Sequence, residues 1–256
     1  MNNLFDVSGK VAVVTGGSTG IGAMIARGFV ENGVKTYITA RKLEPLEAAA
    51  AELSELGQCI AIPSDLSTME GVETFCAAVN ALEPKLDILV NNAGATWGAP
   101  IDDFPESGWD KVMGLNVKSL FFMTQKFLPA LRAAGEEGSP SRVINIASIN
   151  GITHPGMNNY SYSASKSAVI QLTRHLAADL APEYINVNGI APGYFPSKMT
   201  RHLLEFEEEV KKGIPTRSLG SPEDAAGTAI YLCSRASNYI CGHTLAMDGG
   251  IVANAS

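Results

Sequence analysis

The sequence predicts an α/β fold in which seven parallel strands form one doubly wound sheet with helices on both faces. Three observations predict it. Short apolar runs rich in β-branched residues alternate with longer segments of helical periodicity. A glycine-rich turn directly follows the first apolar run. The chain has 256 residues, of which 46% are hydrophobic and 18% charged, enough for one large core. We therefore expect residues 1–256 to form a single domain of the Rossmann type.

The seven strands and six main helices follow from these patterns in chain order. The strands are expected at 10–14, 34–39, 58–62, 86–90, 142–147, 185–189 and 244–247. The helices are expected over 20–32, 43–56, 68–81, 107–134, 159–180 and 222–234. Gly33 and Gly57 follow the first two helices as C-caps. The insertion at 192–213, at the carboxyl edge of the sheet, is expected to be a substrate lid.

Composition excludes several classes of partner. The formal charge of −7 argues against nucleic acid and anionic membranes. The chain shows no apolar run of membrane-spanning length and no leader pattern in its first ten residues, so we expect a cytoplasmic protein. The four histidines are scattered, and no metal is expected. The four cysteines lack C-x-x-C spacing and are expected to be buried free thiols: Cys59, Cys76, Cys233 and Cys241.

The glycine-rich turn after the first strand predicts a dinucleotide site. Residues 15–22 read Thr-Gly-Gly-Ser-Thr-Gly-Ile-Gly and open a helix, whose amino terminus offers N–H donors to a pyrophosphate. The expected contacts in this turn are Gly16, Ser18, Thr19, Gly20, Ile21 and Gly22. The turn lacks the Gly-Lys-Ser/Thr ending of a P-loop, which disfavours a kinase or ATPase.

Arg41 predicts the cofactor. An acidic residue at the end of the second strand would bind the 2′-hydroxyl of NAD, whereas this chain has Ala40 and Arg41 there. A guanidinium can pair with the 2′-phosphate of NADP, so we predict NADP over NAD.

Further polar or small residues follow other strands on the same edge of the sheet. Asp65 follows the third strand, residues 91–94 read Asn-Asn-Ala-Gly after the fourth, and Ser148 follows the fifth. Asn116 interrupts an apolar helical stretch. It either belongs to the same site or is a structural residue that caps the helix or is hydrogen-bonded internally. Open α/β sheets bind ligands at this edge.

Tyr162 and Lys166 supply the parts for proton transfer to a carbonyl oxygen. Four residues apart on a helix, the phenol and the ammonium share a face. A cation beside a phenol is expected to lower the tyrosine pKa toward working pH, which suits a general acid and base. Ser148 can hydrogen-bond the same oxygen.

Taken in order and spacing, these motifs resemble the short-chain dehydrogenase/reductase family in its compact single-domain form. The match runs from about Gly9 to Asp248-Gly249-Gly250. Within the family, the chain is most similar to 3-oxoacyl thioester and carbonyl reductases. The resemblance implies that Tyr162 is the proton donor, that Lys166 lowers its pKa and holds the nicotinamide ribose, and that Ser148 orients the carbonyl. It also implies that Asn116 anchors a water leading from Lys166 to solvent.

The resemblance also places the remaining cofactor contacts. Asp65 and Leu66 would line the adenine, Asn92, Ala93 and Gly94 the ribose, and Pro192 and Gly193 the nicotinamide side, with Ser197 near its carboxamide. Thr19 stands where many NADP-dependent members carry a basic residue, so the prediction of NADP depends mainly on Arg41.

The sequence therefore predicts an NADPH-dependent reductase of a 3-oxoacyl or other medium-sized ketone. The alternatives are an NAD(P)-dependent secondary-alcohol, polyol or sugar-acid dehydrogenase and, more remotely, a non-catalytic nucleotide-binding protein. The substrate pocket is expected from residues 95–97, the loop 149–159, Tyr194, Phe195 and Met199. The resemblance implies a tetramer that forms through the two long helices after the fourth and fifth strands. The apolar run around Phe121, Phe122 and Phe127 in the first of these helices also predicts a homo-oligomer, tetramer or dimer.

Overall fold

A seven-stranded parallel sheet forms the centre of the computed structural model, which describes residues 3–154, 156–196 and 207–254. The strand order is β3-β2-β1-β4-β5-β6-β7, and every pairing is parallel. The strands are β1 Val11–Thr15, β2 Lys35–Thr39, β3 Cys59–Ala61, β4 Ile88–Asn91, β5 Ser141–Ile146, β6 Ile185–Pro192 and β7 Thr244–Met247. The predicted doubly wound α/β fold is confirmed, and the strand order reverses between β1 and β4, where such sheets open a ligand crevice.

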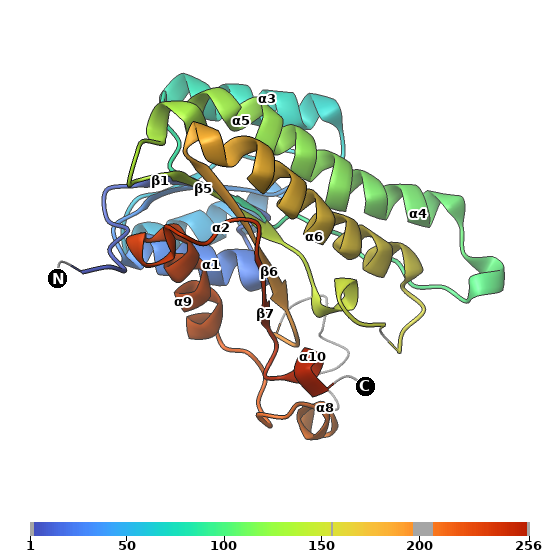
Figure 1. The fold of residues 1–256 in the computed structure, drawn as a ribbon. Coiled ribbons are helices and arrows are strands. Elements are labelled where there is room, and N and C mark those ends of the chain that lie inside the picture. The colour runs from blue at the N-terminus through green and yellow to red at the C-terminus, as the bar shows by residue number, and fades with distance from the viewer. Residues whose placement is uncertain (1–2, 155, 197–206, 255–256) are drawn as a thin grey trace.

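Helices cover both faces of the sheet, with α1, α2 and α9 on one side and α3, α5 and α6 on the other (Figure 1). Their bounds are α1 Gly20–Glu31, α2 Leu43–Ser54, α3 Met69–Leu82, α4 Glu106–Met113, α5 Leu120–Ala134, α6 Tyr160–Leu180 and α9 Pro222–Cys233. Short helices α8 Glu207–Gly213 and α10 Ile251–Asn254 lie beyond the carboxyl ends of β6 and β7 (Figure 1). Among the described residues, no helix is both long and apolar enough to cross a membrane.

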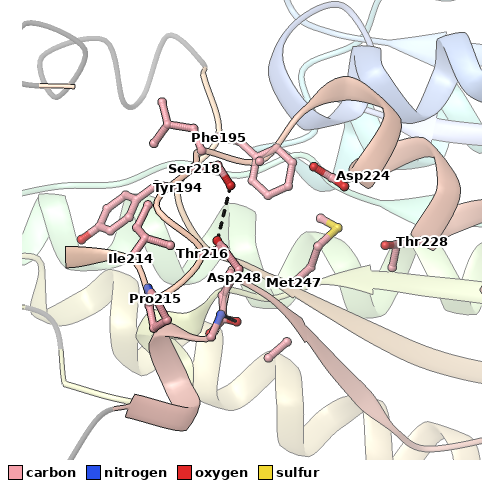
Figure 2. Close-up of a pocket in the computed structure, with 15 residues that line it drawn as sticks. Tyr194, Phe195, Ile214, Pro215, Thr216, Ser218, Asp224, Thr228, Met247 and Asp248 are labelled. Carbon is pink, nitrogen blue, oxygen red and sulfur yellow. Dashed lines mark hydrogen bonds between the residues drawn. The ribbon is translucent and has the colours of Figure 1, made fainter. Parts of the chain in front are cut away.

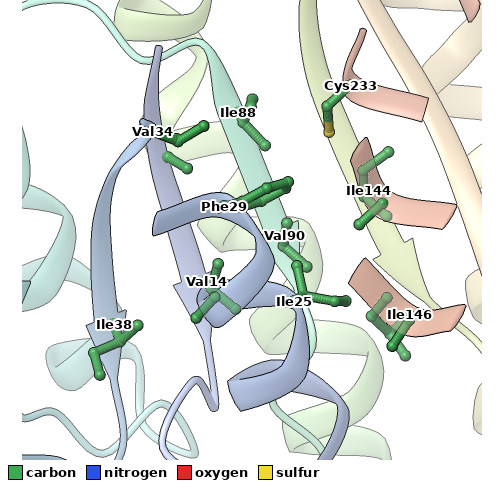
Figure 3. Packing of buried hydrophobic residues seen from close by; sticks show 14 of the residues in the cluster. Val14, Ile25, Phe29, Val34, Ile38, Ile88, Val90, Ile144, Ile146 and Cys233 are labelled. Atoms are coloured by element: carbon green, nitrogen blue, oxygen red, sulfur yellow. The ribbon is translucent and has the colours of Figure 1, made fainter. Parts of the chain in front are cut away.

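Clusters of buried apolar side chains on both faces of the sheet hold these layers together. On the α1 face, Ile25 and Phe29 of the helix pack against Val14, Val90 and Ile144 of three neighbouring strands (Figure 3). All five side chains are fully buried. Because β1 and β4 are buried on both faces, residues 11–14 and 88–90 read in the sequence as continuous apolar runs rather than as alternating patterns.

The helix predicted over 107–134 is present as one helical run from Glu106 to Ala134, but it is not α-helical throughout. It is divided into α4 and α5 by a π-helical segment, η2, at Gly114–Ser119. Asn116 lies inside this segment and points its amide at groups outside the helix, as described below. Wide turns of this kind are frequent at functional sites, and no hydrophobic period marks them in the sequence.

Two smaller expectations also need correction. The sixth strand runs to Pro192 rather than Gly189, because its last residues still pair with β5 and β7. Gly33 has the left-handed φ of +74° expected after a helix, but Gly57 does not. A Cβ at Gly57 would approach the Val30 carbonyl oxygen to 2.8 Å, so close packing rather than a C-cap requires glycine there.

The segment 192–213 begins as the end of β6 and finishes as α8. In α8, Lys211 pairs with Glu207 at 2.7 Å and Lys212 with Glu209 at 2.9 Å. Residues 197–206 lie outside the described residues, so the predicted lid stays a prediction.

Candidate active site

The four predicted catalytic side chains lie together at the carboxyl edge of the sheet. Ser148 lies two residues after the end of β5, Tyr162 and Lys166 come from the first turns of α6, and Asn116 comes from η2. The ammonium Nζ of Lys166 lies 5.6 Å from the centre of the Tyr162 ring, and Ser148 hydrogen-bonds the Tyr162 side chain. Asn116, Ser148 and Lys166 are buried, and Tyr162 is half-buried. The site is therefore a largely buried cluster in which Tyr162 is the most exposed of the four residues.

The electrostatics of this pair differ from the expectation. Burial raises the pKa of Tyr162, and the hydrogen bond with Ser148 works in the opposite direction. The ammonium of Lys166 donates instead to the carbonyl oxygen of Ile146 at 2.7 Å, and burial lowers the lysine pKa to about 8. The prediction that Lys166 lowers the tyrosine pKa is thus wrong for this arrangement. A raised pKa keeps the phenol protonated at neutral pH, which is the form a proton donor needs.

Asn116 connects three parts of the site through one amide. Its Oδ1 accepts the N–H of Ala95 at 2.8 Å, and its Nδ2 donates to the Ala95 carbonyl at 3.0 Å. The same nitrogen donates to Ser165 Oγ at 2.9 Å, and Ser165 donates to the carbonyl of Tyr162 at 2.7 Å. Asn116 is therefore hydrogen-bonded within the protein, as the alternative in the sequence analysis expected. Its amide joins the loop after β4 to α6 beside the Tyr162 phenol.

The glycine turn has the shape of a pyrophosphate cradle. Gly16 and Gly20 have left-handed φ values of +66° and +58°, which favour glycine. A Cβ at Gly22 would come within 2.4 Å of Asn92 Nδ2, so the turn packs closely against the residues that follow β4. The Thr19 side chain makes no capping bond to α1, which leaves the N–H groups of the first helical turn available to an anion. These features fit a bound dinucleotide.

Asn92 holds this turn rather than pointing at a ribose. Its Nδ2 donates to the carbonyls of Thr15 at 2.9 Å and Gly16 at 3.2 Å. Thr15 Oγ1 in turn accepts the N–H groups of Asn92 and Ala93, both at 2.9 Å. The Nδ2 group of Asn92 is therefore occupied by the glycine turn.

The adenine end carries a positive charge. Burial acts to raise the pKa of Asp65, but hydrogen bonds from Ser67 and the charge of Arg41 outweigh it and the pKa is lowered. Arg41 therefore lies close enough to Asp65 to interact with it, at the end of β2 where the 2′-phosphate is expected. Leu66 is buried in the core beside Val13, so only its backbone can line the adenine.

Two of the predicted substrate residues line the same cavity. Tyr194 and Phe195 line a cavity of about 610 Å³ at the ends of β6 and β7, with Ile214, Thr216 and Met247 (Figure 2). The described residues that line it include none of the four catalytic candidates. Pro192 and Gly193 lie at the end of β6, and Gly193 packs against Asp248 of the segment after β7. Ser197 and Met199 lie outside the described residues.

The cysteines only partly match the expectation. Cys76 and Cys233 are buried, Cys59 is half-buried, and Cys241 is exposed, contrary to prediction, in the turn before β7; all four are free thiols. Within residues 3–154, 156–196 and 207–254, no group of His, Cys, Asp or Glu side chains could hold a metal ion.

Two functional groups escaped the sequence reasoning. Ser165 is a small hydroxyl residue just before Lys166, and its position on the same helical turn as Tyr162 was the available signal. The Ile146 carbonyl that binds Lys166 is backbone and leaves no trace in the residue type.

This fold and this cluster define a short-chain dehydrogenase. The family model for short chain dehydrogenases matches residues 10–208, and the chain belongs to that family, which makes it an oxidoreductase and confirms the resemblance found in the sequence. The chain is similar to the rhamnolipids biosynthesis 3-oxoacyl-[acyl-carrier-protein] reductase of Pseudomonas aeruginosa, with 46% identity over 98% of this chain and 99% of that protein. It is also similar to the 2-dehydro-3-deoxy-D-gluconate 5-dehydrogenase of Dickeya dadantii, with 38% identity over 98% of each chain.

A solved structure shares nearly the whole fold. The Pseudomonas aeruginosa RhlG/NADP active-site complex superposes with a TM-score of 0.95 and 46% identity, covering 98% of this chain and all of that one. That relative binds NADP, in agreement with the cofactor predicted from Arg41.

Proposed function

We propose that this protein is an NADPH-dependent reductase of ketones, with 3-oxoacyl thioesters or other medium-sized carbonyl compounds as substrates. The observation that supports it most is the cluster of Ser148, Tyr162 and Lys166, in which burial raises the pKa of the Tyr162 phenol and keeps it protonated. The similarity to a 3-oxoacyl reductase and to an NADP complex supports the substrate class and the cofactor.

Bound NADPH would supply the hydride. Tyr162 gives its proton to the carbonyl oxygen as negative charge develops there, and Ser148 donates a hydrogen bond to the same oxygen. Lys166 holds the nicotinamide ribose and returns a proton to Tyr162. With a pKa of about 8 it can both give and accept that proton near neutral pH. Asn116 fixes the wall of the site through its bonds to Ala95 and Ser165.

The cofactor would lie along the carboxyl edge of β1, β2 and β4. Glycines 16, 20 and 22 with the α1 amino terminus bind the pyrophosphate, and Ser18, Thr19 and Ile21 complete the turn. Arg41 pairs with the 2′-phosphate, and Asp65 with the Leu66 backbone faces the adenine. Ala93 and Gly94 bound the ribose, and Pro192, Gly193 and Ser197 the nicotinamide.

Exposed apolar side chains in and beside the loop that leads into α6 favour an acyl ketone over a sugar acid as the substrate. Ile152 is 43% exposed, Met157 40% and Tyr160 37%, and all three lie in or beside the loop that leads into α6. Apolar surface of this kind suits an alkyl chain, whereas a polyhydroxy acid would not remove it from water. The gluconate relatives nevertheless make sugar-acid dehydrogenation the second candidate.

One experiment separates these candidates. The protein is assayed with NADPH against a panel of 3-oxoacyl thioesters, simple ketones and 5-ketogluconate, and with NADP against the corresponding alcohols. The proposal predicts that kcat/KM is highest for a 3-oxoacyl or similar apolar ketone. A higher value for the sugar acid would transfer the assignment to the rival, and no turnover with any compound would support a non-catalytic nucleotide-binding protein.

The same proposal includes a cytoplasmic homo-oligomer, tetramer or dimer. Phe121 and Phe122 of α5 are only partly buried and contact each other edge to face at 5.3 Å, which leaves apolar surface on the outer side of the helix layer. The four free thiols fit a reducing compartment. Light scattering in solution and cell fractionation test the two statements.

A further inference from the structure

A short loop segment forms part of the wall beside the catalytic cluster. We call residues Ala95–Ala99, which follow Gly94, the strap. At its start the Asn116 amide binds both the N–H and the carbonyl of Ala95, at 2.8 and 3.0 Å. At its end the N–H of Ala99 donates to the Asn158 carbonyl at 3.1 Å, just before α6 begins. The strap thus connects η2 to the segment that leads into Tyr162.

The middle of the strap is fixed by a different kind of contact. The half-buried indole of Trp97 lies flat on Gly108 of α4, so close that a Cβ there would stand 2.7–2.8 Å from Cγ, Cδ1 and Cδ2 of the ring. The ammonium of Lys111 lies 5.2 Å from the ring centre, a cation–π contact. Gly108 and Lys111 are three residues apart, so they present one face of α4 to the ring.

We propose that Trp97, seated between Gly108 and Lys111, is a positioning residue that fixes the strap and, through Ala95, the Asn116 amide at the substrate wall. The inference rests on the proposed ketone reduction, since it assigns a role in that reaction. It gives the tryptophan a task beyond the substrate contact predicted from sequence, because the ring packs against α4.

Gly108 is the sensitive point of this arrangement. Real Cβ atoms essentially never approach other atoms closer than 3.0 Å, so a methyl group at position 108 must displace the indole. The backbone of Trp97 is two residues from Ala95, and a displaced ring therefore pulls on the paired hydrogen bonds to Asn116. A misplacement of this size near reacting groups is enough to slow a positioned reaction strongly.

The test combines three variants with kinetics and cofactor binding. For Trp97→Ala and Gly108→Ala we expect kcat/KM for the ketone to fall at least tenfold, with a higher KM for the ketone and a lower kcat per NADPH-binding site. The Kd for NADPH should stay within twofold of wild type. Trp97→Phe keeps a flat ring on Gly108 and should recover most of the loss. A merely structural role would lower the number of binding sites and leave KM and kcat per site unchanged.

Matched controls and a double variant complete the design. Gly227→Ala adds the same methyl to α9 where a Cβ meets nothing within 4 Å, and Trp109→Phe changes the exposed tryptophan of α4; both should match wild type. Trp97→Ala/Gly108→Ala should be no worse than Trp97→Ala alone, because the small residue leaves room for the methyl.

Two results would overturn the inference: Trp97→Ala within twofold of wild type in KM and kcat per site, or single losses that multiply in the double variant. If Gly108→Ala does not fold, the comparison of Trp97→Ala with Trp97→Phe decides. A wild-type protein that reduces no ketone with NADPH overturns the proposed function instead, so the two failures are distinct.

Discussion

Replacing Lys166 by Met should change how the stability of the protein depends on pH. The buried ammonium has its pKa lowered from 10.5 to about 8, so the folded protein binds fewer protons than the unfolded chain between these values. Stability contributed by this residue therefore rises with pH across that window. A pKa change of about 2.5 corresponds to roughly 3 kcal/mol, which is the cost of keeping Lys166 charged and buried below pH 8.

The assay is urea unfolding of wild type and Lys166→Met at several pH values from 7 to 10 without cofactor. Other titrating groups are common to both proteins and cancel in the difference, and the lost hydrogen bond to Ile146 shifts the variant by a similar amount at each pH. The account predicts that wild type gains about 2–3 kcal/mol relative to the variant between pH 7 and pH 10. Ser167→Ala, which changes an exposed neighbour, should show a constant difference. A constant difference for Lys166→Met as well would refute the depressed lysine pKa.

Three further predictions test other parts of the site. Arg41→Ala should weaken NADPH binding by about 10–100-fold, the value of a charge-assisted pair, with little effect on NADH; equal losses for both cofactors in calorimetry would contradict the 2′-phosphate assignment. Ser165→Ala removes one of the two acceptors of the buried Asn116 amide, so urea unfolding should show a loss of about 1–3 kcal/mol, and a loss below 0.5 kcal/mol would count against this network. Phe121→Asp should lower the mass found by light scattering, whereas a monomeric wild type would remove the oligomer from the account.

The sequence predicted the layers well because buried parallel strands leave a direct signal. Residues 11–14 and 88–90 are apolar at every position because their strands are buried on both faces of the sheet, so the seven strands could be predicted from runs of residue types. The division of the long helix at η2 could not be predicted, because α4, η2 and α5 follow one another without a proline or a cap at the junction.

The site shows the same limit. Spacing brought Tyr162 and Lys166 onto one face of α6, but it could not show that the ammonium bonds to a backbone carbonyl or that burial dominates the phenol pKa. Both depend on how deeply the cluster is enclosed, which only the packed structure reveals. Likewise, the position of Asn92 and Trp97 after β4 gave no sign that the Asn92 amide bonds to the glycine turn or that the Trp97 ring packs on Gly108.

The central claim is that the Tyr162 hydroxyl protonates the substrate oxygen while NADPH delivers hydride. Stopped-flow measurement of NADPH oxidation in a single turnover, with wild type and Tyr162→Phe at saturating ketone, tests it most directly. The account predicts that the variant binds NADPH with an unchanged Kd but oxidises it at least about a thousandfold more slowly. Oxidation at the wild-type rate by Tyr162→Phe would contradict the account.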